Sequence, residues 1–312
     1  TYTEIAQQGG GIQGTVNATR EASEKELLVG AIKRAARLVE EGVTCIEVKS
    51  GYGLDLHTEL KMLKVAKQIA ENLPVSIVTT YLGAHAVPKE YRSNPDDYVQ
   101  FICDQVIPVV AKQRLATCVD VFCESIGFSP AQCRKIFEAA KAHALNVNAH
   151  VEQLSDLKGA KLAAEFGAIS VDHVEYLDPK DIPVLQKSGT VAVLLPGAFY
   201  YLSETQKPPV AALRANQVPM AIATDLNPGS SPIASILTIM NMASVLFGLT
   251  PEEVLYGVTL HAAKALNLSN KGQVKTGMDA DLCLWDIAHP AELVYGINQH
   301  RPSAKWFAGK EC

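Results

Sequence analysis

The sequence predicts an α/β protein built as a (β/α)8 barrel of the TIM type, and three observations lead to this prediction. Short apolar runs alternate with longer amphipathic segments along most of the chain. Each unit comprises one strand, one helix and one return, with no reversal of style, which favours a barrel over a doubly wound sheet. Hydrophobic residues make up 48% of the 312 residues, enough for a large core.

The apolar runs are rich in Val and Ile and are bounded by Gly, Pro, Asn or charged residues, as is typical of buried parallel strands. Seven runs fit this description: Val43–Val48, Val75–Tyr81, Cys118–Cys123, Leu145–Ala149, Ala168–Val171, Val191–Leu195 and Met220–Ala223. Helical patterns lie between them at Glu24–Glu41, Thr58–Glu71, Pro130–Ala144 and Leu154–Phe166.

Seven strands are one fewer than a closed barrel needs, and the first predicted helix precedes the first predicted strand. We therefore expect this chain to be a fragment whose first barrel strand lies before Thr1. We assign residues 1–266 to the barrel. Within 251–266 a helix is expected, and two short strands are expected in 273–287 around a Gly-Met-Asp turn. Residues 267–312 are too few for a core of their own and should return to a small β-sandwich-type layer.

The composition narrows the function classes. The net charge is −5 and no basic block occurs, which argues against a nucleic-acid-binding protein. No apolar run approaches the roughly 20 residues that cross a bilayer, and no export signal is visible. The seven cysteines are scattered without a C-x-x-C pair, so we expect a reducing cytoplasm.

Barrel chemistry lies where strands run into their following loops, and several reactive side chains occur there. His150 is suited to bind zinc or iron, or to bond a neighbouring carbonyl. His173 could be a second ligand, a general acid or base, or a structural residue. A carboxylate such as Asp225 must be paired, metal-bound or shifted in pKa; the alternative to a metal is an ion pair with Lys49 or Arg214.

Weaker signals surround these residues. Tyr52 and His85 lie beside glycines and could hydrogen-bond a substrate, or merely pack a loop. Lys49 could instead form a Schiff base, although this leaves the two histidines and the aspartate unexplained. Residues 229–231 (Gly-Ser-Ser) are expected to open a helix whose N–H groups could hold an anion. Residues 9–11 (Gly-Gly-Gly) are expected to form a flexible turn, and His57, His143 and His289 to be surface residues.

At this point a resemblance to a known family becomes visible. The succession NAHVEQ, SVDHVEY and ATDLNPGSS resembles the metal-dependent amidohydrolases, as do VTLHAAKALN and GQVKTGMDADLCLWD. Within that superfamily, the more specific set GGGI, KSGYG, TYLGAHAVP, VDVFCE and DLNPGS resembles the imidazolonepropionase family of histidine breakdown, over nearly the whole chain.

The resemblance implies hydrolysis of 4-imidazolone-5-propanoate to N-formimidoyl-L-glutamate with one zinc or iron ion, and a homodimer. It implies His150 and Asp225 as metal ligands and His173 as the catalytic histidine. Because Gln153 cannot act as a base, we assign that role to Asp225 or His173. The implied substrate contacts are Tyr52, His85, Gln153, Asn227, Gly229 and Ser230.

One departure is serious. The family's first strand ends in a His-x-His pair that supplies two further ligands, with an arginine shortly after, and none of these is in this chain. If these residues are the entire polypeptide, we expect little or no activity. The alternatives are another cyclic amidohydrolase or aminohydrolase (deaminase), a binuclear site that uses Glu124, and a non-catalytic barrel that binds small molecules.

Overall fold

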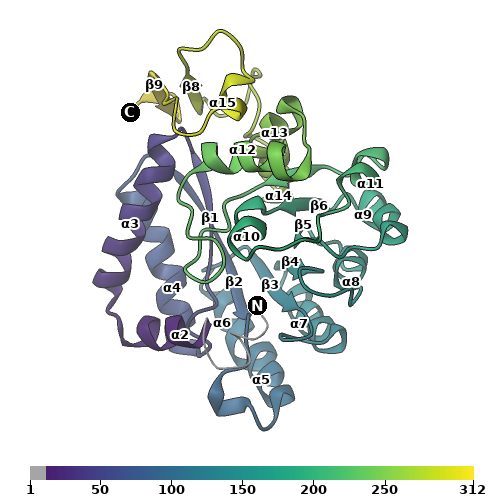
Figure 1. Ribbon diagram of the computed structural model, residues 1–312. Coiled ribbons are helices and arrows are strands. Elements are labelled where there is room, and N and C mark those ends of the chain that lie inside the picture. The colour runs from purple at the N-terminus through teal and green to yellow at the C-terminus, as the bar shows by residue number, and fades with distance from the viewer. Residues whose placement is uncertain (1–11) are drawn as a thin grey trace.

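The computed structural model describes residues 12–312, so the predicted turn at residues 9–11 lies outside the described residues. Within them, seven parallel strands form one curled sheet in strict chain order, from β1 to β7 (Figure 1). Their bounds are β1 Cys45–Lys49, β2 Ser76–Ala84, β3 Cys118–Cys123, β4 Asn146–Val151, β5 Ser170–His173, β6 Val191–Leu194 and β7 Met220–Ile222. The predicted barrel-type arrangement of seven strands is confirmed.

The helices follow the strands and cover the outer face of the sheet (Figure 1). Three predicted helices are confirmed: α3 (Glu24–Glu40), α4 (Leu56–Gln68) and α7 (Pro130–Ala142). The N-termini of α3 and α7 are fixed by capping boxes. The other α-helices are α2 Ile12–Glu21, α5 Pro95–Phe101, α6 Ile107–Lys112, α8 Gly159–Glu165, α9 Ile182–Ser188, α10 Pro196–Tyr201, α11 Val210–Ala215, α12 Ile236–Phe247, α13 Pro251–Val258, α14 Leu260–Ala265 and α15 Glu292–Tyr295.

Two helix predictions differ from the structure. The helix expected over 154–166 begins only at Gly159, because Glu124 binds the loop before it and Glu152 accepts from the first N–H groups of the helix. The helix expected over 251–266 is divided at Thr259, whose backbone (φ −124°, ψ −92°) leaves the helical region between α13 and α14.

The strand alternation separates an apolar face from a polar one. In β3, Val119 and Val121 belong to the main hydrophobic cluster, while Asp120 between them points to the other face of the sheet. Asn148 and Asp172 occupy equivalent alternate positions in β4 and β5 and are also buried. The concave face is therefore lined by ionisable and amide groups, and the convex face packs on the helices.

The C-terminal segment forms an antiparallel sheet of β8 (Leu282–Leu284), β9 (Ala304–Phe307) and β10 (Lys310–Glu311) at one end of the molecule (Figure 1). The two strands predicted within 273–287 are wrong in part: only β8 forms there, and it pairs with β9 instead of with a strand across the Gly-Met-Asp turn. The Lys305 ammonium donates to the Val39 carbonyl oxygen at 2.9 Å, which ties this sheet to α3.

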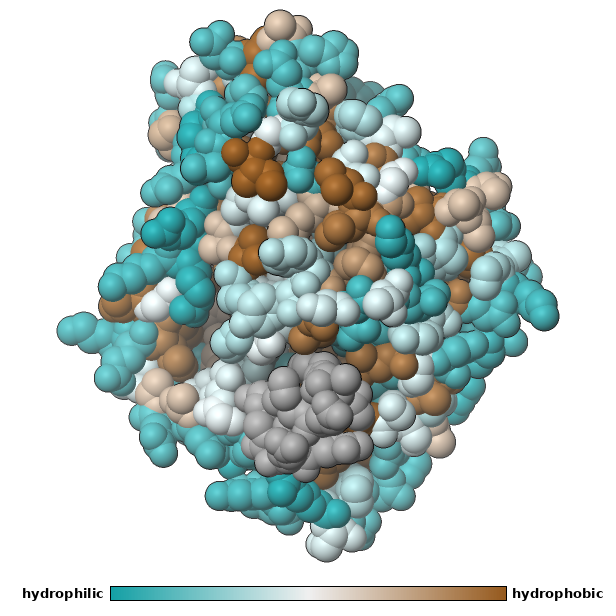
Figure 2. All heavy atoms as spheres, in the orientation of Figure 1, coloured by the Kyte–Doolittle hydropathy of each residue, from teal (hydrophilic) through white to brown (hydrophobic). Residues whose placement is uncertain are grey.

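The visible surface is mostly hydrophilic, with hydrophobic residues gathered in the upper half of the view, where α12 and α15 lie (Figures 1 and 2). Val245 of α12 and Tyr295 of α15 are 71% and 85% exposed. Among the described residues, no helix combines the length and the apolar character that crossing a membrane would require.

Candidate active site

Positive φ at residues other than glycine recurs at the carboxyl edge of the sheet, and it also occurs in loops that precede strands, at Arg114, Ala144 and Gln217. His173 and Val174 follow each other at φ 79° and 64° at the end of β5, Glu152 lies at φ 49° directly after β4, and Asp225 lies at φ 48° three residues after β7. Positive φ is uncommon for residues other than glycine and is a genuine outlier for a β-branched residue such as Val174. Such strain concentrates at functional sites, where surrounding contacts hold it. The three strand ends that sequence analysis singled out thus share one unusual feature.

His150 is fixed by a carboxylate below it. Its Nδ1 lies 3.0 Å from Asp120 Oδ1, and both side chains are buried. Burial opposes protonation of the ring, but the Asp120 carboxylate outweighs it and raises the pKa of His150 to about 9. The ring of His150 lies 5.6 Å from that of His173 between centroids, so the structure brings these two predicted site residues together.

His173 has the opposite electrostatic character. It is 3% exposed, and burial, followed by the charge of His150, lowers its pKa well below the ordinary value. Among the described residues its Nδ1 has no hydrogen-bond partner, and the nearest acid, Glu175 Oε2, lies 3.9 Å away and is also unpartnered. A buried imidazole nitrogen without a hydrogen-bond partner destabilises the fold, and such a group is typical of a functional site.

Asp225 follows β7 and faces the same region. Burial raises its pKa to about 6, and the charge of His150 acts in the opposite direction. Its Oδ2 lies 3.5 Å from the Ser230 hydroxyl. The ion pairs considered from sequence are wrong, because Arg214 is bonded to Glu253 at 2.6 Å and Lys49 to other carboxylates.

The loop after Asp225 is held together by hydrogen bonds among its own residues. The Asn227 side chain accepts hydrogen bonds from the N–H groups of Gly229 and Ser230, and it donates to the Asp225 carbonyl oxygen at 2.7 Å. The expected helix opening at 229–231 is wrong: α12 begins at Ile236, with Ser235 as its N-cap. The N–H groups of Gly229 and Ser230 are used within the loop and are not free to hold an anion.

Tyr52 and His85 meet at the ends of β1 and β2. Their rings are 5.1 Å apart in an edge-to-face arrangement, and His85 Nδ1 lies 3.0 Å from the Gly51 carbonyl oxygen. Burial lowers the pKa of His85 to about 4, so its ring is neutral near pH 7. Glu59 of α4 accepts hydrogen bonds from the N–H groups of Gly51, Gly53 and Leu54, which fixes the loop that carries Tyr52.

Gln153 is held in place through its backbone. Glu124, at the end of β3, accepts from the N–H groups of Gln153 and Leu154 and from the Ser155 hydroxyl. Both carboxylate oxygens of Glu124 are therefore engaged by the loop after β4. This arrangement makes Glu124 a loop clamp and gives no support to a bridging role between two metals.

A buried ionic cluster beneath His150 was missed by sequence analysis. The Lys49 ammonium lies 2.6 Å from Asp120 Oδ2, 3.0 Å from Asp172 Oδ2 and 3.4 Å from Glu47 Oε2. Burial favours the neutral amine, but the three carboxylates outweigh it and raise the pKa of Lys49 well above its ordinary value, which goes against the neutral amine that a Schiff base requires. In the sequence, Glu47 and Asp120 each appear as one acidic residue inside a predicted apolar run, a signal that does not say which face of the strand they occupy.

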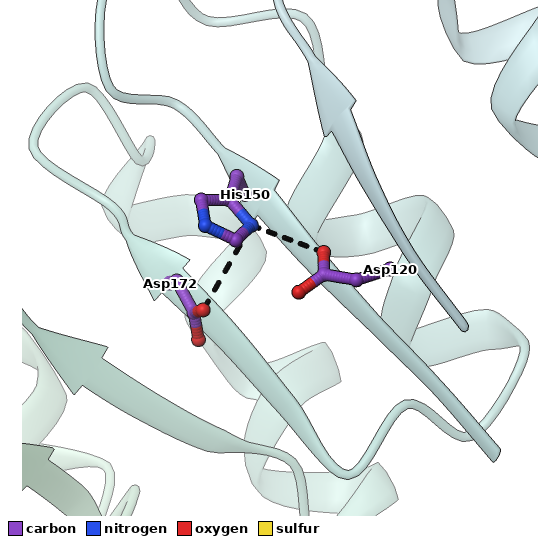
Figure 3. A group of neighbouring side chains, drawn as sticks. All are labelled: Asp120, His150 and Asp172. Carbon is purple, nitrogen blue, oxygen red and sulfur yellow. Dashed lines mark hydrogen bonds and ion pairs between the residues drawn. The ribbon is translucent and has the colours of Figure 1, made fainter. Parts of the chain in front are cut away.

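Asp120, His150 and Asp172 also offer ligand atoms within 4.8 Å of one another, a spacing that could hold a cation (Figure 3). The three side chains come from the neighbouring strands β3, β4 and β5 and converge on the concave face.

Comparison with known proteins decides the family. A family model described as "Amidohydrolase family" matches residues 122–311. The chain is 66% identical over 311 residues to an imidazolonepropionase of Pseudoalteromonas atlantica, covering 100% of this chain and 76% of that protein. A second, from Alteromonas mediterranea, is 64% identical over 99% of this chain and 74% of the relative. The chain belongs to the imidazolonepropionase family.

Solved structures agree on the fold. A zinc-bound adenosine deaminase from Xanthomonas campestris superimposes with a TM-score of 0.74 at 17% identity, over 99% of this chain and 74% of the other. The chain spans about three quarters of the curated relatives it matches. It is accordingly a metal-dependent amidohydrolase, and family membership goes against a non-catalytic binding barrel.

His150 and Asp225 are of the chemical types that bind a divalent ion. His150 is bonded through Nδ1 and presents its other nitrogen on the opposite side of the ring (Figure 3). The Asp225 carboxylate shares the electrostatic environment of His150 and forms no ion pair with Arg214. An imidazole nitrogen and a carboxylate oxygen are donors that both zinc and iron accept.

Proposed function

We propose that this protein opens the ring of 4-imidazolone-5-propanoate by hydrolysis to give N-formimidoyl-L-glutamate, a step of histidine degradation. The observation that carries the proposal is the meeting of His150 and His173 at the strained carboxyl edge of the sheet, with Asp225 in the same electrostatic environment. It is supported by identity of up to 66% to relatives that carry the name imidazolonepropionase. The substrate is a small molecule, and we place the enzyme in the cytoplasm.

One zinc or iron ion would be held by His150 and Asp225. When bound, such an ion lowers the pKa of a water molecule and polarises a carbonyl group. The protein positions the reacting groups. Two of its carboxylates, those of Asp225 and Asp120, have different roles. Asp225 faces the reaction, whereas Asp120 lies behind His150.

The chain's own residues then handle the protons. Asp225 orients the attacking water and accepts its proton as the oxygen adds to the lactam carbonyl carbon. His173 stabilises the negative charge that develops on the carbonyl oxygen through a hydrogen bond. As the ring C–N bond breaks, the proton that Asp225 took from the water passes to the leaving nitrogen, either directly or through His173, which accepts one proton as it gives up another. One water is consumed and one amide bond is cleaved.

Substrate contacts would come from the loops that the buried glutamates hold. Tyr52 and His85 would form one side of the substrate site, because Glu59 fixes the loop that carries Tyr52 and the His85 ring packs against Tyr52. Gln153 forms another side, fixed by Glu124. Ser230 lies near Asp225 and can reach a ligand, while Asn227 and Gly229 act by shaping the loop.

The experiment is an ultraviolet assay with the metal-loaded protein and freshly made 4-imidazolone-5-propanoate. We expect loss of the imidazolone absorbance and the appearance of N-formimidoyl-L-glutamate, identified by mass spectrometry, at a low rate for residues 1–312 by themselves, because these residues do not include the family's His-x-His pair. His173→Asn is the matched control for contaminating activity. The same protein is tested against a panel of other cyclic amides and aminopurines. Turnover of a panel compound in preference to the imidazolone would refute the assignment.

A further inference from the structure

We propose that Asp120 is a positioning residue that holds the His150 ring by its Nδ1–H, so that Nε2 is the nitrogen offered to the metal ion. Lys49 is the resident cation that holds Asp120 in place. This inference rests on the metal-binding role proposed for His150, but it concerns contacts within the chain itself.

The hydrogen bond between the two residues is direct and buried. His150 Nδ1 and Asp120 Oδ1 are 3.0 Å apart, Asp120 is 0% exposed and His150 is 8% exposed. They come from adjacent strands, with Phe122 of β3 paired to His150 of β4, so the contact is set by the sheet register. A rigid sheet fixes such a pair more firmly than a loop could.

Asp120 divides its two oxygens between two partners. Oδ1 accepts from His150, and Oδ2 accepts from the Lys49 ammonium at 2.6 Å. Asp172 cannot replace it, because its Oδ2 lies 3.9 Å from His150 Nδ1, beyond hydrogen-bond distance, and also binds Lys49, at 3.0 Å. Asp120 is therefore the group that sets the orientation of the ring.

The same cluster could be taken for the metal site itself, since Asp120, His150 and Asp172 approach one another closely (Figure 3). Two facts go against that interpretation. Lys49 already places a positive charge among Asp120, Asp172 and Glu47. Its ammonium lies 3.4 Å from Glu47 Oε2. The nitrogen that His150 turns toward them is the one engaged by Asp120.

A histidine ligand commonly donates its second ring N–H to a carboxylate, which fixes the tautomer, orients the ring and raises its basicity. Loss of such a partner typically weakens metal affinity by about 10- to 100-fold. Asp120 stands in that relation to His150, and the buried carboxylate–ammonium contact explains why Asp120 is available as a charged acceptor.

The test compares the full chain with Asp120→Ala, which removes the acceptor, and Asp120→Asn, which can still accept from Nδ1–H. Glu59→Gln is the control for a changed buried carboxylate that does not touch His150. Zinc affinity is measured by competition with a chromophoric chelator. Nitrogen-15 correlation spectra of the histidine rings report which His150 nitrogen carries the hydrogen-bonded proton, and His150→Gln assigns the signal.

We expect a low-field ring proton on His150 Nδ1 in the unsubstituted protein, lost in Asp120→Ala. Zinc affinity should fall about 10- to 100-fold in that variant, less in Asp120→Asn, and little in Glu59→Gln. A hydrogen-bonded proton on Nε2, or unchanged zinc affinity in Asp120→Ala, would overturn the inference while leaving the proposed reaction intact. Absence of zinc binding by the unsubstituted protein would overturn the proposed metal site and the inference together.

Discussion

The rings of His150 and His173 lie 5.6 Å apart with an angle of 50° between their planes. They come from neighbouring strands, since Val151 pairs with His173 in the register of β4 and β5. The first ring is bonded to a carboxylate, whereas the second has an unpartnered Nδ1 among the described residues. The two histidines at this strand edge therefore have different surroundings, which agrees with the different roles that we propose for them, metal binding for His150 and hydrogen bonding to the reacting groups for His173.

Replacing His173 with Asn separates these tasks. We expect kcat to fall by about 10²- to 10⁴-fold, the range typical of a lost acid–base group, because the ring that faces the carbonyl oxygen is gone. Metal content should stay the same, since His150 and Asp225 remain. Steady-state kinetics and metal analysis of the same preparation check this, and turnover close to that of the unsubstituted protein would contradict the role given to His173.

Asp225→Asn should affect both properties. The amide is a weaker ligand than the carboxylate and cannot accept the proton of the attacking water, so metal affinity and kcat are both expected to fall. Measured alongside His173→Asn, the Asp225→Asn variant distinguishes a residue that binds the metal ion from one that only lies near it. Full metal occupancy in Asp225→Asn at low metal concentration would remove Asp225 from the ligand set.

Lys49→Met leaves Glu47, Asp120 and Asp172 without their shared cation. Removing one partner of a buried ionic group costs about 3–5 kcal/mol, so urea-induced unfolding should occur at a clearly lower concentration. Lys158→Met is the matched control, because Lys158 also contacts three carboxylates, those of Asp156, Asp178 and Asp181, but its side chain is 46% exposed. A loss no larger than that of the control would show that the buried cluster contributes little to stability.

The fold and the strand-end residues could be predicted from the sequence because both follow from simple patterns. Val- and Ile-rich runs identify parallel strands, and chain order then places His150, His173 and Asp225 at one edge. Asp120 was not identified, although it lies in one of these runs. Inside the run Cys118–Cys123 it looks like an interruption, and nothing local says that its face of the strand lines the inside of the sheet.

The predicted helix starts were wrong where side chains accept hydrogen bonds from backbone N–H groups. The segment after Asp225 has the composition of a helix start, but Asn227 takes up the N–H groups that a helix or an anion would use. The helix expected from Leu154 is delayed for the same kind of reason, since Glu124 and Glu152 bond the loop and the N-terminus of α8. The Asn227 bonds are local and span two and three residues, a known turn pattern, whereas Glu124 lies 30 residues before Leu154, so only the second case was beyond the reach of local sequence.

Glu175 gives a prediction about pH. It is 3% exposed, and burial raises its pKa well above the ordinary value. The folded protein therefore keeps a proton on Glu175 at pH values where the unfolded chain has lost it, and this group makes stability fall as pH rises above about 4.3 toward the raised pKa. Glu175→Gln removes that dependence.

The measurement is the urea midpoint of both proteins from pH 5 to pH 9. The midpoint of the unsubstituted protein minus that of Glu175→Gln should decrease steadily as pH rises. The lowered pKa of His173 acts in the opposite direction, destabilising the fold as pH falls below about 6.5, and because both proteins contain His173 its contribution largely cancels. Glu71→Gln, at an exposed position, is the control for loss of a surface carboxylate. A difference that grows with pH would contradict the prediction. It would mean that the fold stabilises Glu175 as an anion, with His173 as its partner.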